Sequence, residues 1–250
     1  MKLKDSLQLP ERGVFALIGG GGKTSSMYRL SQEYAREGKT VLCTTTTHIM
    51  APQPPFPTAL LLEEDIPFTR AQLLKDWAAQ DTPILIFARR TGQEKLCAPS
   101  DDFFNWCSAA ADVVLIEADG ARHLPFKAPA EHEPVVPACV TRIIGVAGAD
   151  ALMQPIAQLC HRPQLVSAIL NVPQESLLTP ERMAQVILSP AGYHKAVRAD
   201  LPFGLILNKC DVPSRRELAQ QTAAQLRAQG AAFPIVLCSM QQEEVCLCEG

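Results

Sequence analysis

The chain has 250 residues, of which 47% are hydrophobic and 20% are charged, and its formal net charge is −3. This composition supports one large α/β domain or two small ones. Because no five like charges are consecutive, it gives no sign of a nucleic-acid partner. Residues 1–5 lack the apolar core of a signal peptide and no apolar run reaches 18 residues, so we expect a soluble, cytoplasmic protein without membrane spans.

A glycine-rich segment follows the first apolar run. Residues 14–18 predict a buried strand, and residues 25–37 predict a helix that Gly38 ends. A strand, a glycine turn and a helix start in this order form a phosphate-binding device, because backbone N–H groups and the helix dipole attract anions. The predicted phosphate-binding residues are Gly19, Gly20, Gly21, Gly22, Lys23, Thr24 and Ser25, with the Thr24 hydroxyl as a ligand of Mg²⁺.

The spacing of this segment departs from the usual G-x-x-x-x-G-K-[ST], whose first glycine would fall on Leu17. The shorter G-x-x-G-K-T, counted from Gly19, resembles the phosphate loop of Mur-type ligases. The alternative is a glycine turn followed by a chance Lys-Thr pair. The strand before it and the helix after it favour the phosphate loop.

The next predicted strand, residues 39–44, runs into four threonines, Thr44 to Thr47. Ligands bind at the carboxyl edge of open parallel sheets, so these hydroxyls can hold Mg²⁺ or a γ-phosphate. We predict Thr46 as a metal ligand together with Thr24. The alternative is a run of β-formers that simply continues the strand. Residues 51–57 are proline-rich and predict a loop.

The middle of the chain predicts helices at 69–80 and 101–110 and strands at 84–88 and 112–116. The last of these strands ends in Glu117 and Asp119, which point the same way from an extended chain. We predict both, with Lys23, as catalytic residues, and Asp119 or Glu117 as the carboxylate that organises Mg²⁺, as in P-loop NTPases. The alternative is a turn that begins at an Asp-Gly pair.

A charged, proline-containing stretch occupies residues 121–139. Lys127 and the Glu131-His132-Glu133 run could bind a metal or steer protons, but the residues by themselves favour a solvated loop. A strand follows at 142–147. Residues 150–200 contain helical signals broken by prolines, and Thr179-Pro180 predicts the start of one helix.

The last third predicts a strand at 203–207, a helix at 214–229 and a strand at 233–238. Between the first two lies Asn208-Lys209-Cys210-Asp211, an N-K-x-D motif. Its aspartate can accept from the guanine N1–H and N2–H₂ edge, which adenine lacks, while Asn208 fixes the loop and the Lys209 stem covers the ring. The alternative is a polar loop in which Asp211 caps the next helix.

The cysteines near the C-terminus, Cys238, Cys246 and Cys248, lack the paired C-x₂-C spacing of a zinc site. Soft-metal or selenium-linked sulfur chemistry is one interpretation. A frayed tail with incidental cysteines is the interpretation that the sequence favours.

Strands that alternate with helices predict an α/β, three-layer, P-loop NTPase-like fold. We expect a mostly parallel sheet with helices on both faces. We further expect a single domain over residues 1–250 with a helical insertion at about 150–200.

The assembled segments resemble the YqeC family over essentially the full length. The resemblance rests on residues 18–24, 41–48 and 208–211, and above all on the block from Glu117-Ala118-Asp119-Gly120-Ala121-Arg122 to Glu131-His132-Glu133-Pro134. It implies an accessory role in making or inserting the cofactor of a selenium-dependent molybdenum hydroxylase, with that enzyme or its cofactor-making enzymes as partners. By resemblance only, it also implies functions for Lys127 and His132.

Three hypotheses follow. The first is an Mg²⁺-dependent P-loop NTPase that uses GTP or ATP for cofactor maturation, with slow intrinsic turnover because no arginine finger is identifiable. The second is an ATP-dependent ligase or kinase that acts on a pterin or selenium compound. The third is a cofactor carrier that uses nucleotide only as a switch.

Overall fold

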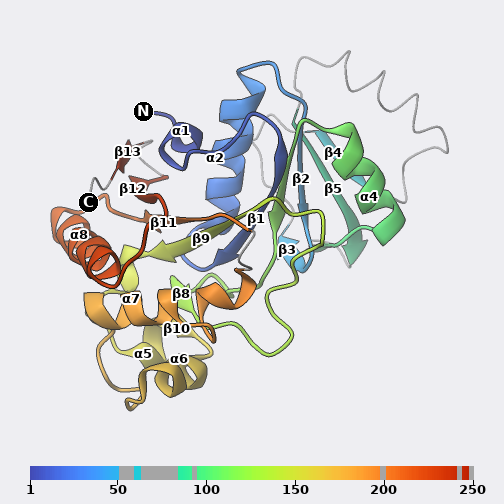
Figure 1. Cartoon of the computed structure of the whole chain (residues 1–250). Helices are drawn as coiled ribbons and strands as arrows, with labels where there is room; N and C mark the ends of the chain where they lie inside the picture. The colour runs from blue at the N-terminus through green and yellow to red at the C-terminus, as the bar shows by residue number, and fades with distance from the viewer. Residues whose placement is uncertain (51–58, 63–83, 92–94, 198–200, 241–243, 248–250) are drawn as a thin grey trace.

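The computed structural model describes residues 1–50, 59–62, 84–91, 95–197, 201–240 and 244–247 (Figure 1). Its helices are α1 (Leu3–Ser6), α2 (Lys23–Ala35), α4 (Asp101–Ala110), α5 (Ile156–Leu159), α6 (Pro163–Leu170), α7 (Pro180–Leu188) and α8 (Pro213–Ala228), with 3₁₀ turns η2 (Ala149–Ala151) and η3 (Tyr193–Ala196). Its strands are β1 (Gly13–Gly19), β2 (Val41–Thr45), β3 (His48–Met50), β4 (Ala59–Leu62), β5 (Ile84–Thr91), β6 (Lys95–Cys97), β7 (Val113–Glu117), β8 (Phe126–Lys127), β9 (Arg142–Gly148), β10 (Cys160–His161), β11 (Phe203–Asn208), β12 (Ile235–Ser239) and β13 (Glu244–Leu247).

The strands form a main sheet in the order β13-β12-β11-β9-β1-β7-β2-β5-β6-β3, with β4 also paired to β5. All pairings from β12 to β5 are parallel, and so is β4 with β5, whereas β13, β6 and β3 add antiparallel edges. The mostly parallel α/β fold expected from the alternation of strands and helices is therefore confirmed.

Alternate residues of β1 face opposite sides of the sheet, as the period of two requires. Val14, Ala16 and Ile18 join one core with side chains of α4, α7 and α8, and Phe15 and Leu17 join the other with side chains of α1 and α2. Because β1 is buried on both faces, its sequence is a continuous apolar run rather than an alternating one. The helices accordingly lie on both faces of the sheet.

The parallel arrangement brings the ends of distant strands to one edge. Gly19 ends β1 between Glu117 at the end of β7 and Gly148 at the end of β9. Asn208 ends β11, in register with Gly148. Residues separated by almost 200 positions in the sequence thus meet at the carboxyl edge, where open sheets bind ligands.

The segment at 150–200 is mainly helical in its described part, as expected. Helix α7 begins at Pro180, and the Thr179 hydroxyl caps it by accepting from the N–H of Arg182 at 3.3 Å. One feature was not predicted: β10 pairs in parallel with β8, so that His161 lies beside Lys127. Figure 1 shows this helical segment next to the sheet, with α7 alongside α8.

The C-terminal segment corrects one expectation. Instead of a frayed tail, residues 244–247 form β13, which pairs antiparallel with β12. The predicted loop at 51–57, the predicted helix at 69–80 and Cys248 lie outside the described residues. Within the described residues, no helix has the length and apolar character needed to cross a bilayer.

Candidate functional site

The glycine segment turns sharply between β1 and α2. Gly21 and Gly22 have φ of 78° and 126°, which side chains rarely adopt. A Cβ at Gly21 would collide with the backbone of Gly148, and one at Gly22 would collide with the amide of Asn208. The glycines are therefore needed because two other strand ends lie directly against this loop.

The first three glycines of the loop already use their N–H groups. Gly19 donates to both oxygens of Asp119 at 3.1 and 3.0 Å, Gly20 to the carbonyl of Val146, and Gly21 to that of Leu124. Helix α2 begins at Lys23, and the first four N–H groups of a helix have no partner within it. The N–H groups best placed for an anion are therefore those of residues 22–25.

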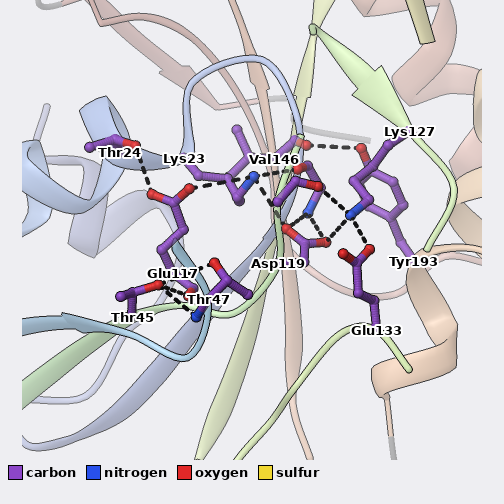
Figure 2. Close-up of polar contacts among 12 residues, drawn as sticks. Lys23, Thr24, Thr45, Thr47, Glu117, Asp119, Lys127, Glu133, Val146 and Tyr193 are labelled. Atoms are coloured by element: carbon purple, nitrogen blue, oxygen red, sulfur yellow. Dashed lines mark hydrogen bonds and ion pairs between the residues drawn. The ribbon is translucent and has the colours of Figure 1, made fainter. Parts of the chain in front are cut away.

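Thr24 and Glu117 meet at the start of α2. The Thr24 hydroxyl donates to Glu117 Oε2 at 2.7 Å, and Lys23 Nζ lies 3.8 Å from the other carboxylate oxygen (Figure 2). Glu117 is only 8% exposed. A hydroxyl and a carboxylate oxygen side by side are hard oxygen ligands of the kind that Mg²⁺ takes.

Asp119, which follows Glu117 after Ala118, has a different environment. Besides the N–H of Gly19, it is paired with Lys23 Nζ at 3.2 Å and with Lys127 Nζ at 3.2 Å. Lys23 also donates to the carbonyl of Gly19 at 2.6 Å and is 4% exposed. The two predicted carboxylates thus differ: Glu117 faces the Thr24 hydroxyl, whereas Asp119 forms an ion pair with Lys23.

The charges continue away from the loop toward the helical segment. Lys127, fully buried, donates to Glu133 Oε2 at 2.6 Å and to the carbonyl of Gly120 at 2.6 Å, and Arg162 binds Glu133 through two bonds of 2.6 and 3.0 Å. Burial would raise the pKa of Glu133, but the bonds from Arg162 and Lys127 outweigh it and hold the pKa at about 2. We call Lys23, Asp119, Lys127, Glu133 and Arg162 the charge chain.

The predicted threonines lie at the same carboxyl edge of the sheet, but their hydroxyls bond mainly to backbone groups. The Thr45 hydroxyl donates to the carbonyl of Glu117 at 2.9 Å and accepts from the N–H of Thr47. The Thr46 hydroxyl donates to the carbonyl of Val135 at 2.8 Å. No contact in the described part joins Thr46 to Thr24, so its role as a metal ligand stays a prediction.

Asn208 of the N-K-x-D motif contacts the glycine loop directly. Its Nδ2 donates to the carbonyl of Gly21 at 2.8 Å, and its Oδ1 accepts from the N–H of Met240 at 3.2 Å. The buried amide therefore joins the glycine loop to the segment after β12.

The other two residues of the motif are more accessible. Lys209, with φ of 64°, donates to Asp150 Oδ2 at 2.7 Å, and Asp211 lies 3.7 Å from Arg215. Helix α8 is preceded by Val212 without a side-chain cap. Asp211 therefore does not cap α8, which was the structural alternative to base recognition.

Within the described ranges, no three His, Cys, Asp or Glu side chains gather as a metal centre of their own. Mg²⁺ commonly binds through one or two protein oxygens, with substrate phosphates and water completing its shell. Thr24 and Glu117 fit that pattern. Glu133, by contrast, is committed to Lys127 and Arg162, so the solvated loop expected for residues 131–133 does not hold for this glutamate.

Two participants were missed at the sequence level. Arg162 precedes α6 and Asp150 follows β9, and neither belongs to a motif. Their partners, Glu133 and Lys209, lie 29 and 59 positions away. These two residues could have been identified only by knowing which oppositely charged residues form ion pairs with them. The sequence does not show which charged residues lie close together in the fold.

The chain is similar to known proteins over much of its length. The family model described as YqeC protein matches residues 15–164. The Escherichia coli (strain K12) protein described as "Uncharacterized protein YqeC" is 28% identical over 191 residues, which cover 74% of this chain and 71% of that protein. The match of the family model spans the glycine loop, Glu117 and the whole charge chain.

Proposed function

The chain belongs to the YqeC family, and we propose that its glycine loop is a nucleotide site at which the protein binds and hydrolyses GTP or ATP with Mg²⁺. The observation that carries this proposal is the contact of 2.7 Å between the Thr24 hydroxyl and Glu117, beside the amine of Lys23. This contact places the start of helix α2, the ammonium group of Lys23 and the carboxylate at the end of strand β7 side by side at the carboxyl edge of the sheet.

Each residue then has a defined task. The free N–H groups at the start of α2 hold phosphate oxygens, and Lys23 contributes its charge to the outer phosphates. Thr24 and Glu117 would hold Mg²⁺. The bound metal would neutralise the negative charge that develops on the transferred phosphoryl group. Asp119 keeps Lys23 at the loop by its ion pair of 3.2 Å.

The N-K-x-D segment supports guanine as the preferred base. Asn208 links this segment to the phosphate loop, and the Asp211 carboxylate is partly exposed. A carboxylate can accept two hydrogen bonds from guanine and none of that kind from adenine. GTP is therefore the first nucleotide to test, with ATP as the competitor.

A calorimetric titration with Mg²⁺ and GTP, ATP or CTP tests this proposal. We expect saturable binding that Lys23→Ala and Thr24→Val abolish, and a preference for GTP that Asp211→Ala removes. Lys39→Ala, beyond the far end of α2, and Glu217→Ala, on the exposed side of α8, are the matched controls. Binding that survives both phosphate-loop variants would refute the proposal, and stoichiometric binding without turnover would refute its hydrolytic half.

We also propose that this nucleotide chemistry serves the maturation of a selenium-dependent molybdenum hydroxylase cofactor. The support is the resemblance noted above, whose most distinctive block, residues 117–134, contains most of the charge chain. Cells that make the hydroxylase with Lys23→Ala in place of the native chain should produce enzyme depleted in its cofactor. Full cofactor content in those cells would contradict this role.

A further inference from the structure

The ring of Tyr193, in η3 of the helical segment, fills a slot in the sheet beside the glycine loop. Two glycines on neighbouring strands line this slot, Gly19 at the end of β1 and Gly145 in β9. A Cβ at Gly19 would lie 2.7 Å from the tyrosine ring, and a Cβ at Gly145 would lie 3.2 Å from it. The absence of both side chains therefore leaves room for the ring, which packs directly against the first glycine of the loop.

The Tyr193 hydroxyl bonds to the same backbone carbonyl as the loop does. The carbonyl of Val146 accepts from the N–H of Gly20 at 2.9 Å and from the Tyr193 hydroxyl at 3.0 Å (Figure 2). A carbonyl oxygen has two lone pairs, so it can accept both bonds at once. Burial, followed by the charge of Asp119, raises the pKa of Tyr193 well above its usual value. The hydroxyl therefore keeps its proton and remains a donor to this carbonyl.

The tyrosine is itself held in place from several sides. Its ring stacks on the ring of Phe126, with centroids 5.4 Å apart and planes inclined by 24°. In the same 3₁₀ turn, the Lys195 amine donates to the carbonyls of Ala130 and Glu131 at 2.6 and 2.7 Å. These contacts fix η3 against the body of the protein, so the position of the ring and of its hydroxyl is set by the helical segment.

We propose that Tyr193 is a positioning residue for phosphate binding, which holds the glycine loop in the path that presents the N–H groups of residues 22–25. The inference rests on the proposed nucleotide site. The bond from Gly20 to Val146 fixes the loop just before α2 begins, and Tyr193 supports that bond through the shared carbonyl and through its ring. Because Tyr193 acts through the loop backbone, the helical segment contributes to the geometry of the nucleotide site.

Tyr193→Phe keeps the ring in its slot and removes only the hydroxyl. Without nucleotide, we expect the Gly20 N–H to exchange with solvent roughly 3-fold to 10-fold faster, the equivalent of one neutral hydrogen bond, as measured by NMR. Tyr34→Phe is the matched control, because the Tyr34 side chain is also buried and its hydroxyl donates to the carbonyl of Pro10 at 2.7 Å. Tyr34 lies near the far end of α2, so the control should leave Gly20 exchange unchanged.

Calorimetric titration of the same variants with GTP and Mg²⁺ measures the consequence for binding. We expect Tyr193→Phe to weaken the affinity by roughly 3-fold to 10-fold and Tyr34→Phe to leave it unchanged. Melting temperatures of the two variants should fall by similar amounts, since each loses one buried bond from a hydroxyl to a carbonyl, so lost stability would not explain a difference in affinity.

Unchanged Gly20 exchange in Tyr193→Phe, or an equal change in Tyr34→Phe, would overturn the inference. Faster exchange with unchanged GTP affinity would overturn the positioning role. If the native chain bound no nucleotide, the proposed function would fail by itself, and the exchange rates would still decide whether Tyr193 positions the loop.

Discussion

Glu117 and Glu133 are equally buried, at 8% exposure each, yet their surroundings differ. Glu133 has two cations within hydrogen-bond distance, Lys127 at 2.6 Å and Arg162 at 2.6 and 3.0 Å. Glu117 has a neutral hydroxyl at 2.7 Å and one ammonium group at 3.8 Å. The comparison teaches that a buried carboxylate whose charge is balanced by two hydrogen-bonded cations stabilises the fold. A buried carboxylate with only one distant ammonium group can still bind a further cation.

The largest effect should come from removing the cation that Asp119 and Glu133 share. Lys127→Met removes one of the two cations that contact each carboxylate, while Asp119 keeps Lys23 and Glu133 keeps Arg162. We therefore expect a loss of about 1.5–3 kcal/mol in the free energy of unfolding, the cost of a hydrogen bond to a charged group, measured by urea denaturation. Glu117→Gln keeps the shape and the acceptor for Thr24 and should cost less than about 1 kcal/mol. Equal losses in both variants would show that the two glutamates do not differ in role.

The stability of the fold should depend on pH in two adjoining ranges, an upper one set by His161 and a lower one set by Glu133. His161 has a folded pKa of about 4 against 6.5 in the unfolded chain, so below pH 6.5 the unfolded chain binds a proton that the fold rejects. Stability should therefore fall as the pH drops from 6.5 to 4. Glu133, with a pKa of about 2 against 4.5, stabilises the fold above pH 4.5, and this contribution is lost as the pH falls toward 2.

Melting temperatures measured across pH check these ranges. His161→Gln should flatten the upper range and leave the lower one. Burial also lowers the pKa of His194, so some slope in the upper range should remain. An unchanged slope in His161→Gln would mean that this histidine does not titrate as inferred.

A smaller effect is expected on metal-dependent affinity. Glu117→Gln removes a negative charge beside Thr24, so nucleotide affinity in Mg²⁺ should drop by roughly 10-fold to 100-fold, while affinity in excess chelator changes little. Calorimetry with and without Mg²⁺ measures the difference. Glu175→Gln, an exposed glutamate in the helical segment, is the control, and an equal drop in chelator would argue against a metal role for Glu117.

The smallest effect should come from the partly exposed pair Lys209 and Asp150. Their side chains are 35% and 20% exposed at 2.7 Å, so Lys209→Ala should change unfolding free energy by less than about 1 kcal/mol. If Lys209 covers the base, the same variant should still weaken nucleotide binding. Unchanged affinity would remove Lys209 from the site.

Several parts of the fold were predictable because they depend on local patterns. The runs at residues 14–18 and 203–207 are long and apolar enough to predict buried strands, and the turn at 19–24 needs glycines wherever a helix follows such a strand. Strands β3, β4, β6, β8, β10 and β13 were not predicted. Each has two to four residues, which is too short for a periodic signal, and each exists only because a partner strand lies beside it.

The residues of the candidate site also fall into a predictable group and an unpredictable group. Lys23, Thr24, Glu117 and Asn208 could be identified from motifs and strand ends, since parallel strands bring their carboxyl ends together. The burial of Lys127 and Glu133 could not be predicted, because charged residues in an irregular stretch are ordinarily solvated. Their burial depends on Arg162, 29 positions beyond Glu133.

The amino-acid sequence by itself thus determined the alternation of strands and helices, the glycine turn and the residues at the carboxyl edge, because these follow from hydrophobic period and backbone sterics. Only the tertiary structure decided which carboxylate faces Thr24, which one holds Lys23, and that Arg162 binds Glu133. The physical reason is that a buried charge is balanced by opposite charges on other segments of the chain. The distances between those segments are set by the fold and cannot be read from the local sequence pattern.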